Sequence, residues 1–361
     1  MSDDILFTPG HLGDLSLRNR IVLAPLTRSR ADANGVPSDL APEYYAQRAG
    51  AGLIITEATQ ISFEGMGYPR TPGVHTPEQF ASWKPIIEAV HAKGSKIVAQ
   101  LWHVGRIAAH ANRGVKADVV APSDSRAPGE MYTDDEGMVP HDRPRALETD
   151  EIARIAAEYA EAAEKAIAAG FDGVELHSAN GYLLHQFLST NVNTRTDRYG
   201  GSIENRIRMP LEVLDAILEK VPARKVGIRV SPRHTFNGIE EADSDQLYAA
   251  YYEELSRRGL AYLHVMRAFT HELDTDIVAF ADQHYAGDIL VCGEYTKEEG
   301  AEVLNAGHAK AVAYGRPFIA NPDLVERFRK DAPLNEPDSD TFYTPGPKGY
   351  IDYPTLEEVG A

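Results

Sequence analysis

Three side chains that could act together on a carbonyl compound lie close together in the segment HSANGYLLHQ. His177 and Asn180 can each donate a hydrogen bond to one carbonyl oxygen. Tyr182 keeps its proton at neutral pH, because the reference pKa of tyrosine is about 10, so it can serve as a proton donor. An isolated histidine is more often a core residue. The concentration of three such groups after one predicted strand instead favours a catalytic site.

Arg229 lies within the apolar run VGIRVSP, where a charged side chain would be buried. A buried arginine is costly unless it has an anionic partner. That partner could be a carboxylate of the protein such as Glu175, in a purely structural ion pair. It could equally be a bound anionic ligand or cofactor. The residues alone leave both alternatives open.

A phosphate site is indicated by Gly293, Gly315 and Arg316, which lie at the ends of two late apolar runs. Barrel enzymes often bind phosphate at such a place with backbone N–H groups and a helix N-terminus. The same glycines could also be ordinary turn residues, and their spacing does not decide between the two interpretations.

Other chemistries lack their usual patterns. Glu57, Glu175 and His177 could be imagined as metal ligands, but no HExxH or comparable spacing is present, so no metal is expected. A G-x-S-x-G nucleophile elbow is also absent. An aldolase would need a Schiff-base lysine, and no lysine stands obviously at a strand end.

The elements that must position these residues are short apolar runs that alternate with helical patterns. The runs are continuous, which is typical of parallel strands that are buried on both faces. Helix ends are marked as well: Thr76, Pro77 and Gln79 predict one start, Thr149 predicts another, and Gly170 predicts an end. The apolar runs cover residues 21–25, 52–58, 96–103, 173–179, 226–232, 262–267, 288–295 and 309–316.

Eight strands alternating with helices predict an α/β protein with a single (β/α)8 TIM barrel, as one domain over residues 1–361. A doubly wound sheet is the rival, but it would carry a Gly-rich turn after its first strand. The sequence there is APLTRSR, without that pattern.

A barrel needs about 250 residues, which leaves a surplus of about 110 in this chain. Residues 1–20 read as an N-terminal β-hairpin that plugs the barrel. Residues 104–148 read as an insertion after the third strand with little regular structure, and residues 331–361 form a C-terminal tail. The interior insertions follow the carboxyl ends of strands, the face where barrels place active sites.

Composition narrows the class of protein. The 361 residues carry 36 Lys and Arg against 54 Asp and Glu, a net charge of −18, which argues against nucleic acid as a partner. No apolar stretch is long enough for a membrane span, and no secretory signal is visible. With one cysteine and no internal disulfide, a cytoplasmic monomer or homodimer is expected.

At the level of whole motifs the chain resembles the old yellow enzyme family of flavin-dependent ene-reductases. The resemblance runs from about Leu6 to Pro354. Within the family, the chain is similar to bacterial N-ethylmaleimide-reductase and xenobiotic-reductase types of the classical branch. Thr27 fits that branch, since thermophilic-like members usually have cysteine there. The motifs that carry it are NRIVLAPLTRSRA, YYAQRAGAGLIITEAT, AQLWHVGR, GFDGVELHSANGYLLHQFLS, NTRTDRYGGSIENRIR, IRVSP, YGRPFIANPDL and KGYIDYP.

The resemblance implies noncovalent FMN at the barrel mouth and NAD(P)H as the reductant. It places His177 and Asn180 on the substrate oxygen and makes Tyr182 the proton donor. His177 also counts among the flavin contacts. The other implied flavin contacts are Pro25, Leu26, Thr27, Ala58, Gln100, Arg229, Gly293, Gly315 and Arg316, and the implied pocket lining is Tyr68, Trp102 and Tyr343.

The implied activity is reduction of the activated C=C bond of α,β-unsaturated carbonyls, imides and nitroalkenes. Hydride would pass from the flavin N5 to the β-carbon, and Tyr182 would protonate the α-carbon. Reduction of nitrate esters or nitroaromatics on the same flavin barrel is the first alternative. A flavin-free barrel isomerase or aldolase is the remote one.

Overall fold

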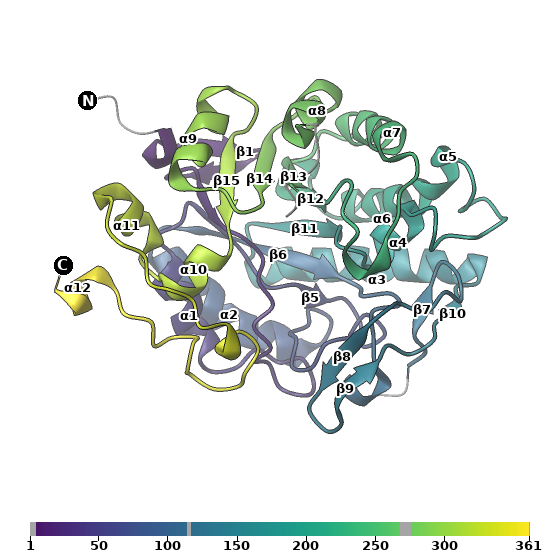
Figure 1. The fold of residues 1–361 in the computed structure, drawn as a ribbon, viewed down its shortest axis with the longest axis horizontal. Coiled ribbons are helices and arrows are strands. Elements are labelled where there is room, and N and C mark those ends of the chain that lie inside the picture. The colour runs from purple at the N-terminus through teal and green to yellow at the C-terminus, as the bar shows by residue number, and fades with distance from the viewer. Residues whose placement is uncertain (1–4, 114–116, 268–275, 361) are drawn as a thin grey trace.

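Eight parallel strands close into a barrel at the centre of the molecule (Figure 1). The computed structural model describes residues 5–113, 117–267 and 276–360. Each barrel strand lies inside one of the eight predicted runs, so the predicted TIM barrel is confirmed. In ring order the strands are β3 (Ile21–Leu23), β4 (Leu53–Ile55), β6 (Lys96–Trp102), β11 (Gly173–Ser178), β12 (Val226–Val230), β13 (Tyr262–Met266), β14 (Ile289–Cys292) and β15 (Ala311–Tyr314), which pairs with β3.

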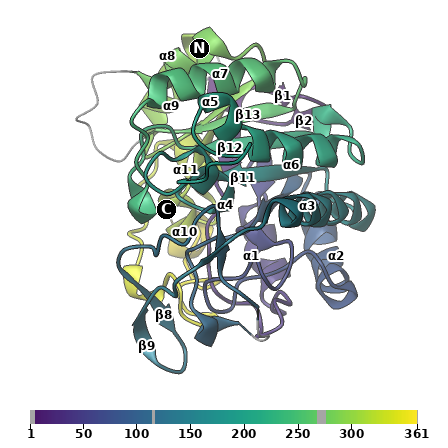
Figure 2. The same cartoon turned by 90° about the vertical axis from the view of Figure 1, so that its right-hand side faces the viewer.

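Helices surround the strands, as the two views at right angles show (Figures 1 and 2). The predicted capping box of Thr76 and Gln79 starts α2, and Gly170 ends α3. None of the described helices is long and apolar enough to cross a membrane. The helices are α1 (Ala41–Arg48), α2 (Pro77–Ala92), α3 (Thr149–Ala169), α4 (Leu183–Leu188), α5 (Ile203–Arg206), α6 (Arg208–Leu218), α7 (Ser244–Ser256), α8 (Ile277–His284), α9 (Lys297–Asn305), α10 (Arg316–Ala320), α11 (Leu324–Lys330) and α12 (Leu356–Val359).

The amino end of the barrel is closed by an antiparallel hairpin of β1 (Gly10–Leu12) and β2 (Leu15–Leu17), the predicted plug. Leu12, Leu15 and Leu17 are buried in one cluster with side chains of the barrel strands. At the turn, the Gly13 N–H donates to Asp288 Oδ2 at 3.1 Å. Burial of the three leucines therefore seals this end, and a ligand must enter from the opposite one.

The carboxyl ends of the strands are covered by the insertion after β6 and by the C-terminal tail. The insertion contains more regular structure than we expected, because β8 (Glu130–Thr133) and β9 (Gly137–Pro140) form an antiparallel hairpin. Alternation of exposed and buried residues along β8 is too short to stand out in the sequence. Two further short strands, β7 (Val120–Ala121) and β10 (Arg145–Ala146), pair in parallel, and β5 (Thr59–Gln60) extends the barrel sheet.

Close packing around Gly13, in the turn between β1 and β2, predicts that alanine destabilises the protein more there than at Gly129, which precedes β8. Gly13 has a φ of +56°, and a Cβ there would lie 2.5 Å from both Ala261 Cα and the Arg224 carbonyl oxygen. Gly129 has a φ of +80° but nothing within 4 Å. We expect Gly13→Ala to lower the free energy of unfolding by roughly 2–4 kcal/mol and Gly129→Ala by about 1 kcal/mol. Chemical denaturation measures both, and equal losses would contradict the close packing of the plug.

Candidate active site

Strand register brings the polar residues of the barrel interior into two adjacent rows. His177 on β11 is the paired neighbour of Arg229 on β12, which in turn pairs with His264 on β13. Glu175 on β11 pairs in the same way with Gln100 on β6. Because paired residues of parallel strands point to the same face, all five side chains crowd into the carboxyl half of the barrel.

The Arg229 side chain is buried and lacks a carboxylate partner within 4 Å among the described residues. Its Nη2 lies 3.2 Å from Met266 Sδ and 3.9 Å from Cys292 Sγ, which are weak acceptors. Its Nε is buried with no hydrogen-bond partner in the described chain. A guanidinium with unused donors in such a place favours an anionic ligand over the purely structural ion pair.

Glu175, the protein carboxylate considered for that pair, already has other partners. It accepts from His264 Nδ1 at 2.8 Å and from Gln100 Nε2 at 2.7 Å. Burial would raise the pKa of Glu175, but attraction to His264 and then to Arg229 outweighs it and lowers that pKa. The ionised Glu175 thus balances the charge of these two rows without touching Arg229.

His177 is held as a neutral imidazole. Burial, followed by the positive charge of Arg229, lowers the pKa of His177 well below its usual value. Its Nδ1 accepts a hydrogen bond from the Ala179 N–H at 3.3 Å. The ring proton therefore resides on Nε2, an assignment that follows from the hydrogen bond. His177 consequently presents one fixed N–H donor.

A tight turn after β11 places Asn180 and Tyr182. Asn180 and Gly181 have φ values of +56° and +75°, and the Tyr182 N–H donates to the Ala179 carbonyl at 3.2 Å. Asparagine and glycine are the residues that tolerate this left-handed backbone best. His185 and Gln186, for which no role is predicted from the sequence, hold the turn in place. The Gly181 N–H donates to His185 Nδ1 at 2.9 Å, and Gln186 Nε2 donates to the Gly181 carbonyl at 2.7 Å.

Aromatic rings pack around the Tyr182 side chain. Tyr182 is half-buried, and its hydroxyl donates to the Tyr68 hydroxyl at 3.3 Å. Trp102 is buried behind both rings, with ring centroids 4.9 Å from Tyr182 and 5.7 Å from Tyr68. Burial, with Tyr68 next, raises the pKa of Tyr182 well above its usual value. Tyr182 therefore remains protonated.

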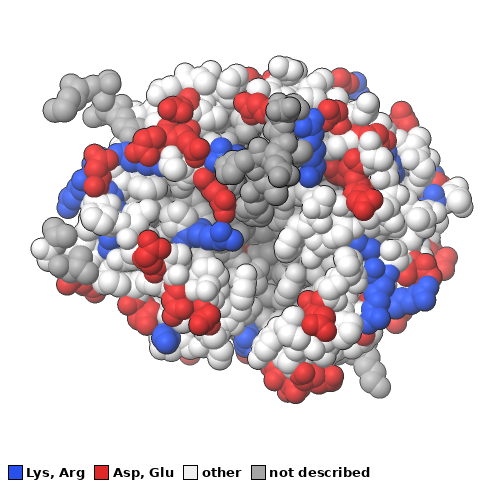
Figure 3. All heavy atoms as spheres, in the orientation of Figure 1, with Lys and Arg blue, Asp and Glu red and all other residues white. Residues whose placement is uncertain are grey.

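Two adjacent cavities, which share lining residues, lie at this end of the barrel. The inner cavity has a volume of about 420 Å³ and includes Asn180 in its wall. A hollow in the face shown in Figure 3 is bordered by side chains of both charges. Seven of the predicted cofactor residues line the inner cavity: Pro25, Leu26, Thr27, Arg229, Gly293, Gly315 and Arg316.

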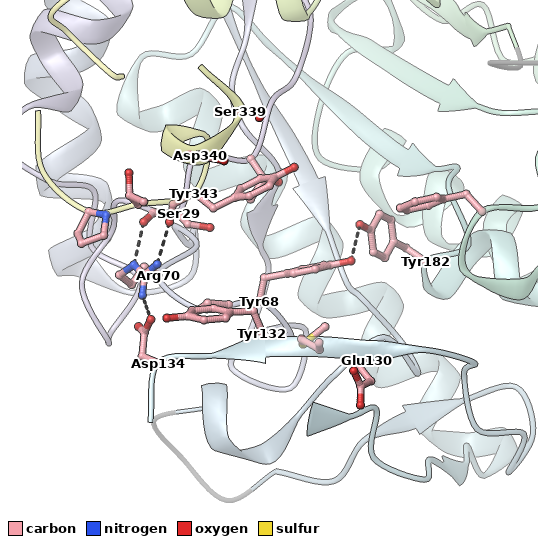
Figure 4. A pocket seen from close by; sticks show the side chains of 16 residues that line it. Ser29, Tyr68, Arg70, Glu130, Tyr132, Asp134, Tyr182, Ser339, Asp340 and Tyr343 are labelled. Carbon is pink, nitrogen blue, oxygen red and sulfur yellow. Dashed lines mark hydrogen bonds and ion pairs between the residues drawn. The ribbon is translucent and has the colours of Figure 1, made fainter. Parts of the chain in front are cut away.

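The outer cavity, of about 920 Å³, lies between the β8–β9 hairpin and the tail (Figure 4). Tyr68, Tyr182 and Tyr343 line it, and Thr27, Phe236 and Tyr343 line both cavities. The predicted residues Ala58, Gln100, Trp102 and His177 are buried and are absent from both sets of lining residues.

One end of the inner cavity carries the predicted phosphate residues. Gly315 is the N-cap of α10, and Arg316 is its first residue. The Arg316 side chain is exposed, and its Nη1 pairs with Glu294 Oε1 at 2.9 Å. Glu294, which lines the same cavity, was not among the predicted residues. The end of the inner cavity where phosphate binding is predicted therefore contains a carboxylate beside the Arg316 guanidinium.

Buried arginines hold the tail against the mouth, a function the sequence analysis missed. Arg28 donates to the Gly349 carbonyl at 2.6 Å, and Arg30 donates to the Thr341 and Lys348 carbonyls, both at 2.9 Å. Glu57 accepts from the Arg28 N–H at 3.0 Å, and burial raises the pKa of Glu57 to about 7. These contacts fix the segment that carries Tyr343. The motif LTRSRA contains both arginines, but only the fold brings the tail to them.

Fold and site together define a barrel with a cavity lined by the buried Arg229 and by Asn180, close to a protonated tyrosine. No group of three or more potential ligands in the described chain could hold a metal ion. The chain belongs to the NADH:flavin oxidoreductase / NADH oxidase family, whose model matches residues 5–335. FMN is thus the cofactor and NAD(P)H the reductant, which decides against the flavin-free isomerase or aldolase.

Relatives and solved structures agree with this family. Morphinone reductase has 47% identity and a TM-score of 0.95, covering 100% of this chain and 98% of that chain. The old yellow enzyme homologue of Zymomonas mobilis has 42% identity and a TM-score of 0.93, covering 97% and 99%. 12-oxophytodienoate reductase 1 of Oryza sativa subsp. japonica is 46% identical over 98% of this chain and 94% of its own length. A probable flavin mononucleotide-dependent alkene reductase of Leishmania infantum is 41% identical over 98% of both chains.

The residues of the inner cavity fit FMN. The unpartnered Arg229 Nε suits an acceptor that gains negative charge on reduction, and Arg316 suits a phosphate. Small-molecule cavities commonly range over ~300–1,000 Å³, so the inner cavity has an adequate volume.

Replacing Arg229 tests whether its partner is the cofactor or the protein. We expect Arg229→Met to raise the Kd for FMN at least about tenfold, because a charge-assisted hydrogen bond is lost. The apoprotein should melt nearly as before, since Glu175 keeps His264 and Gln100. Fluorescence titration and thermal melting measure the two effects. Arg257→Met, at the exposed C-cap of α7, is the control. A large loss of stability with unchanged FMN affinity would favour the structural ion pair.

The state of His177 can be observed directly. We expect its imidazole to remain neutral, with the proton on Nε2, as the pH falls through about 6.5, because burial and Arg229 disfavour the charged form. Nitrogen-15 NMR of histidine-labelled protein distinguishes this tautomer from the imidazolium. A His177 titration near pH ~6.5 would contradict the assignment.

Proposed function

We propose that this protein reduces the activated C=C bond of α,β-unsaturated aldehydes, ketones, imides and nitroalkenes. The observation that carries the proposal is the meeting of His177 and Tyr182, whose ring centroids are 5.0 Å apart, next to Asn180 in the wall of the inner cavity. When bound and reduced, FMN supplies a hydride from N5 to the β-carbon of the substrate.

His177 and Asn180 hold the substrate oxygen in this proposal. Both are neutral donors. The tautomer of His177 fixes its ring N–H, and the backbone N–H of Asn180 donates to Ser231 Oγ at 2.8 Å, which holds the backbone that carries its side-chain amide. As negative charge collects on the oxygen, each donor contributes roughly 3–4 kcal/mol, by analogy with oxyanion holes. Neutral N–H donors suit this task because they hydrogen-bond the substrate oxygen and keep their own protons, which leaves proton transfer to Tyr182.

Tyr182 supplies the proton to the α-carbon. Its raised pKa keeps the proton in place until the neighbouring carbon carries negative charge. Tyr182 and its hydrogen-bond partner Tyr68 both line the outer cavity, so the proton can be replaced from that side. From the family resemblance, flavin contacts are assigned to Pro25, Leu26, Thr27, Ala58, Gln100, His177, Arg229, Gly293, Gly315 and Arg316, and Tyr68, Trp102 and Tyr343 are assigned to the substrate pocket. Of these, Ala58, Gln100, His177 and Trp102 lie outside the sets of lining residues.

The Tyr182→Phe variant tests the central step. We expect it to slow reduction of weakly activated enones by roughly 10²–10⁴-fold, because the proton donor is lost. Reduction of the flavin by NADH or NADPH should change little. Anaerobic stopped-flow absorbance measures the two half-reactions separately.

Tyr68→Phe is the matched control, since it removes the neighbouring hydroxyl but leaves Tyr182 its proton; we expect a smaller loss. Unchanged turnover of cyclic enones by Tyr182→Phe would overturn its assigned role. Turnover of nitrate esters or nitroaromatics that survives in a variant inactive on enones would identify the alternative reaction, which needs hydride but no such proton.

A further inference from the structure

The wall of the outer cavity is unevenly charged. Glu130, Asp134 and Asp340 contribute carboxylates to it, and Arg70 is the one cationic side chain among the described residues of this wall (Figure 4). The cavity itself is the entrance to the site described above. Its charges bear on which ligands can pass or remain there.

All three guanidinium nitrogens of Arg70 are already engaged with groups of the protein. It donates from Nε to the Ser29 carbonyl and from Nη2 to the Tyr343 carbonyl, both at 2.9 Å, and from Nη1 to the Asp134 carboxylate. Arg70 thereby ties the first loop, the tail and the β8–β9 hairpin together. This neutralises Asp134 and uses the cation for structure.

Glu130 and Asp340 are left without a cation. Both side chains are exposed, and neither forms an ion pair within 4 Å in the part of the chain that the structure describes. They stand on opposite walls, one on β8 and the other on the tail. The mouth therefore carries two uncompensated negative charges toward any ligand.

Aromatic rings at the same mouth indicate a surface for flat groups. Tyr132, Phe236 and Tyr343 are 51%, 54% and 59% exposed, and all three line the outer cavity. Exposed apolar side chains that gather at one opening usually mark a binding surface. Stacking on these rings does not depend on the charge at the remote end of a ligand. The carboxylates of Glu130 and Asp340 therefore determine whether anionic or cationic ligands are preferred.

We propose that the outer cavity selects against anionic ligands, so that the enzyme uses NADH in preference to NADPH and neutral or cationic enones in preference to carboxylate-bearing ones. The inference rests on the proposed function, in which both reactants enter through this mouth. NADPH differs from NADH by a 2′-phosphate, which enzymes usually accommodate with an arginine. Here the free charges have the opposite sign. Because salt screens such charges over about 8 Å, the preference should weaken as ionic strength rises.

The nicotinamide arm measures kcat/KM for flavin reduction with both nucleotides. We expect NADH to be favoured at least about fivefold at low salt, and less at high salt. Glu130→Lys/Asp340→Lys should lower that ratio at least about fivefold, by attracting the 2′-phosphate. The control Glu88→Lys/Glu253→Lys changes the net charge equally at exposed positions on α2 and α7. We expect it to leave the ratio unchanged.

The enone arm compares one cyclic enone in three forms, with a neutral, an ammonium or a carboxylate group remote from its double bond. We expect the carboxylate form to have the highest KM, and the lysine double variant to reverse the order of the charged forms. Equal KM values, or equal use of NADH and NADPH, would overturn the charge selection. A flavin that is reduced by NADH but not reoxidised by any of the three enones would instead contradict the proposed function.

Discussion

The buried guanidinium of Arg229 is the constraint around which the site is organised. A cation in the barrel interior must be balanced, and the carboxylate of the adjacent row, Glu175, is engaged by His264 and Gln100. Arg229 is left with weak sulfur acceptors and an unused Nε, which suits an anionic group in the inner cavity. The same charge helps to keep the adjacent His177 neutral. One buried charge thus affects both Arg229's own surroundings and the protonation of His177.

The barrel strands and the segments added to the barrel carry different residues of the site. Strands carry Arg229 and His177, whose positions depend on register, whereas a tight turn and flanking loops carry Asn180, Tyr182 and Thr27. The tail and the β8–β9 hairpin complete the outer cavity, where Arg70 joins them. Rigid strands therefore hold the reacting geometry, and loops set what may approach it.

Much of this arrangement could be predicted from residues and spacing. Continuous apolar runs identify the eight strands, because strands buried on both faces need apolar residues at every position. The grouping of His177, Asn180 and Tyr182, and the unexplained Arg229, indicated the site. Other contacts were beyond reach. Glu294 is distant in sequence from Arg316, and Arg28 and Arg30 meet carbonyls some three hundred residues further along the chain.

By itself, then, the sequence determined the fold class, which depends on local periodicity, and it indicated the residues able to do chemistry, which depend on residue type. The flavin family followed from the resemblance of its motifs. Only the tertiary structure decided what each charge faces. Within the described ranges, it left Arg229 without a carboxylate partner, used Arg70 to join three segments, and placed Glu130 and Asp340 unpaired at one mouth. The physical reason is that electrostatic partners are set by distance in space, and chain closure brings together charges that lie far apart in the sequence.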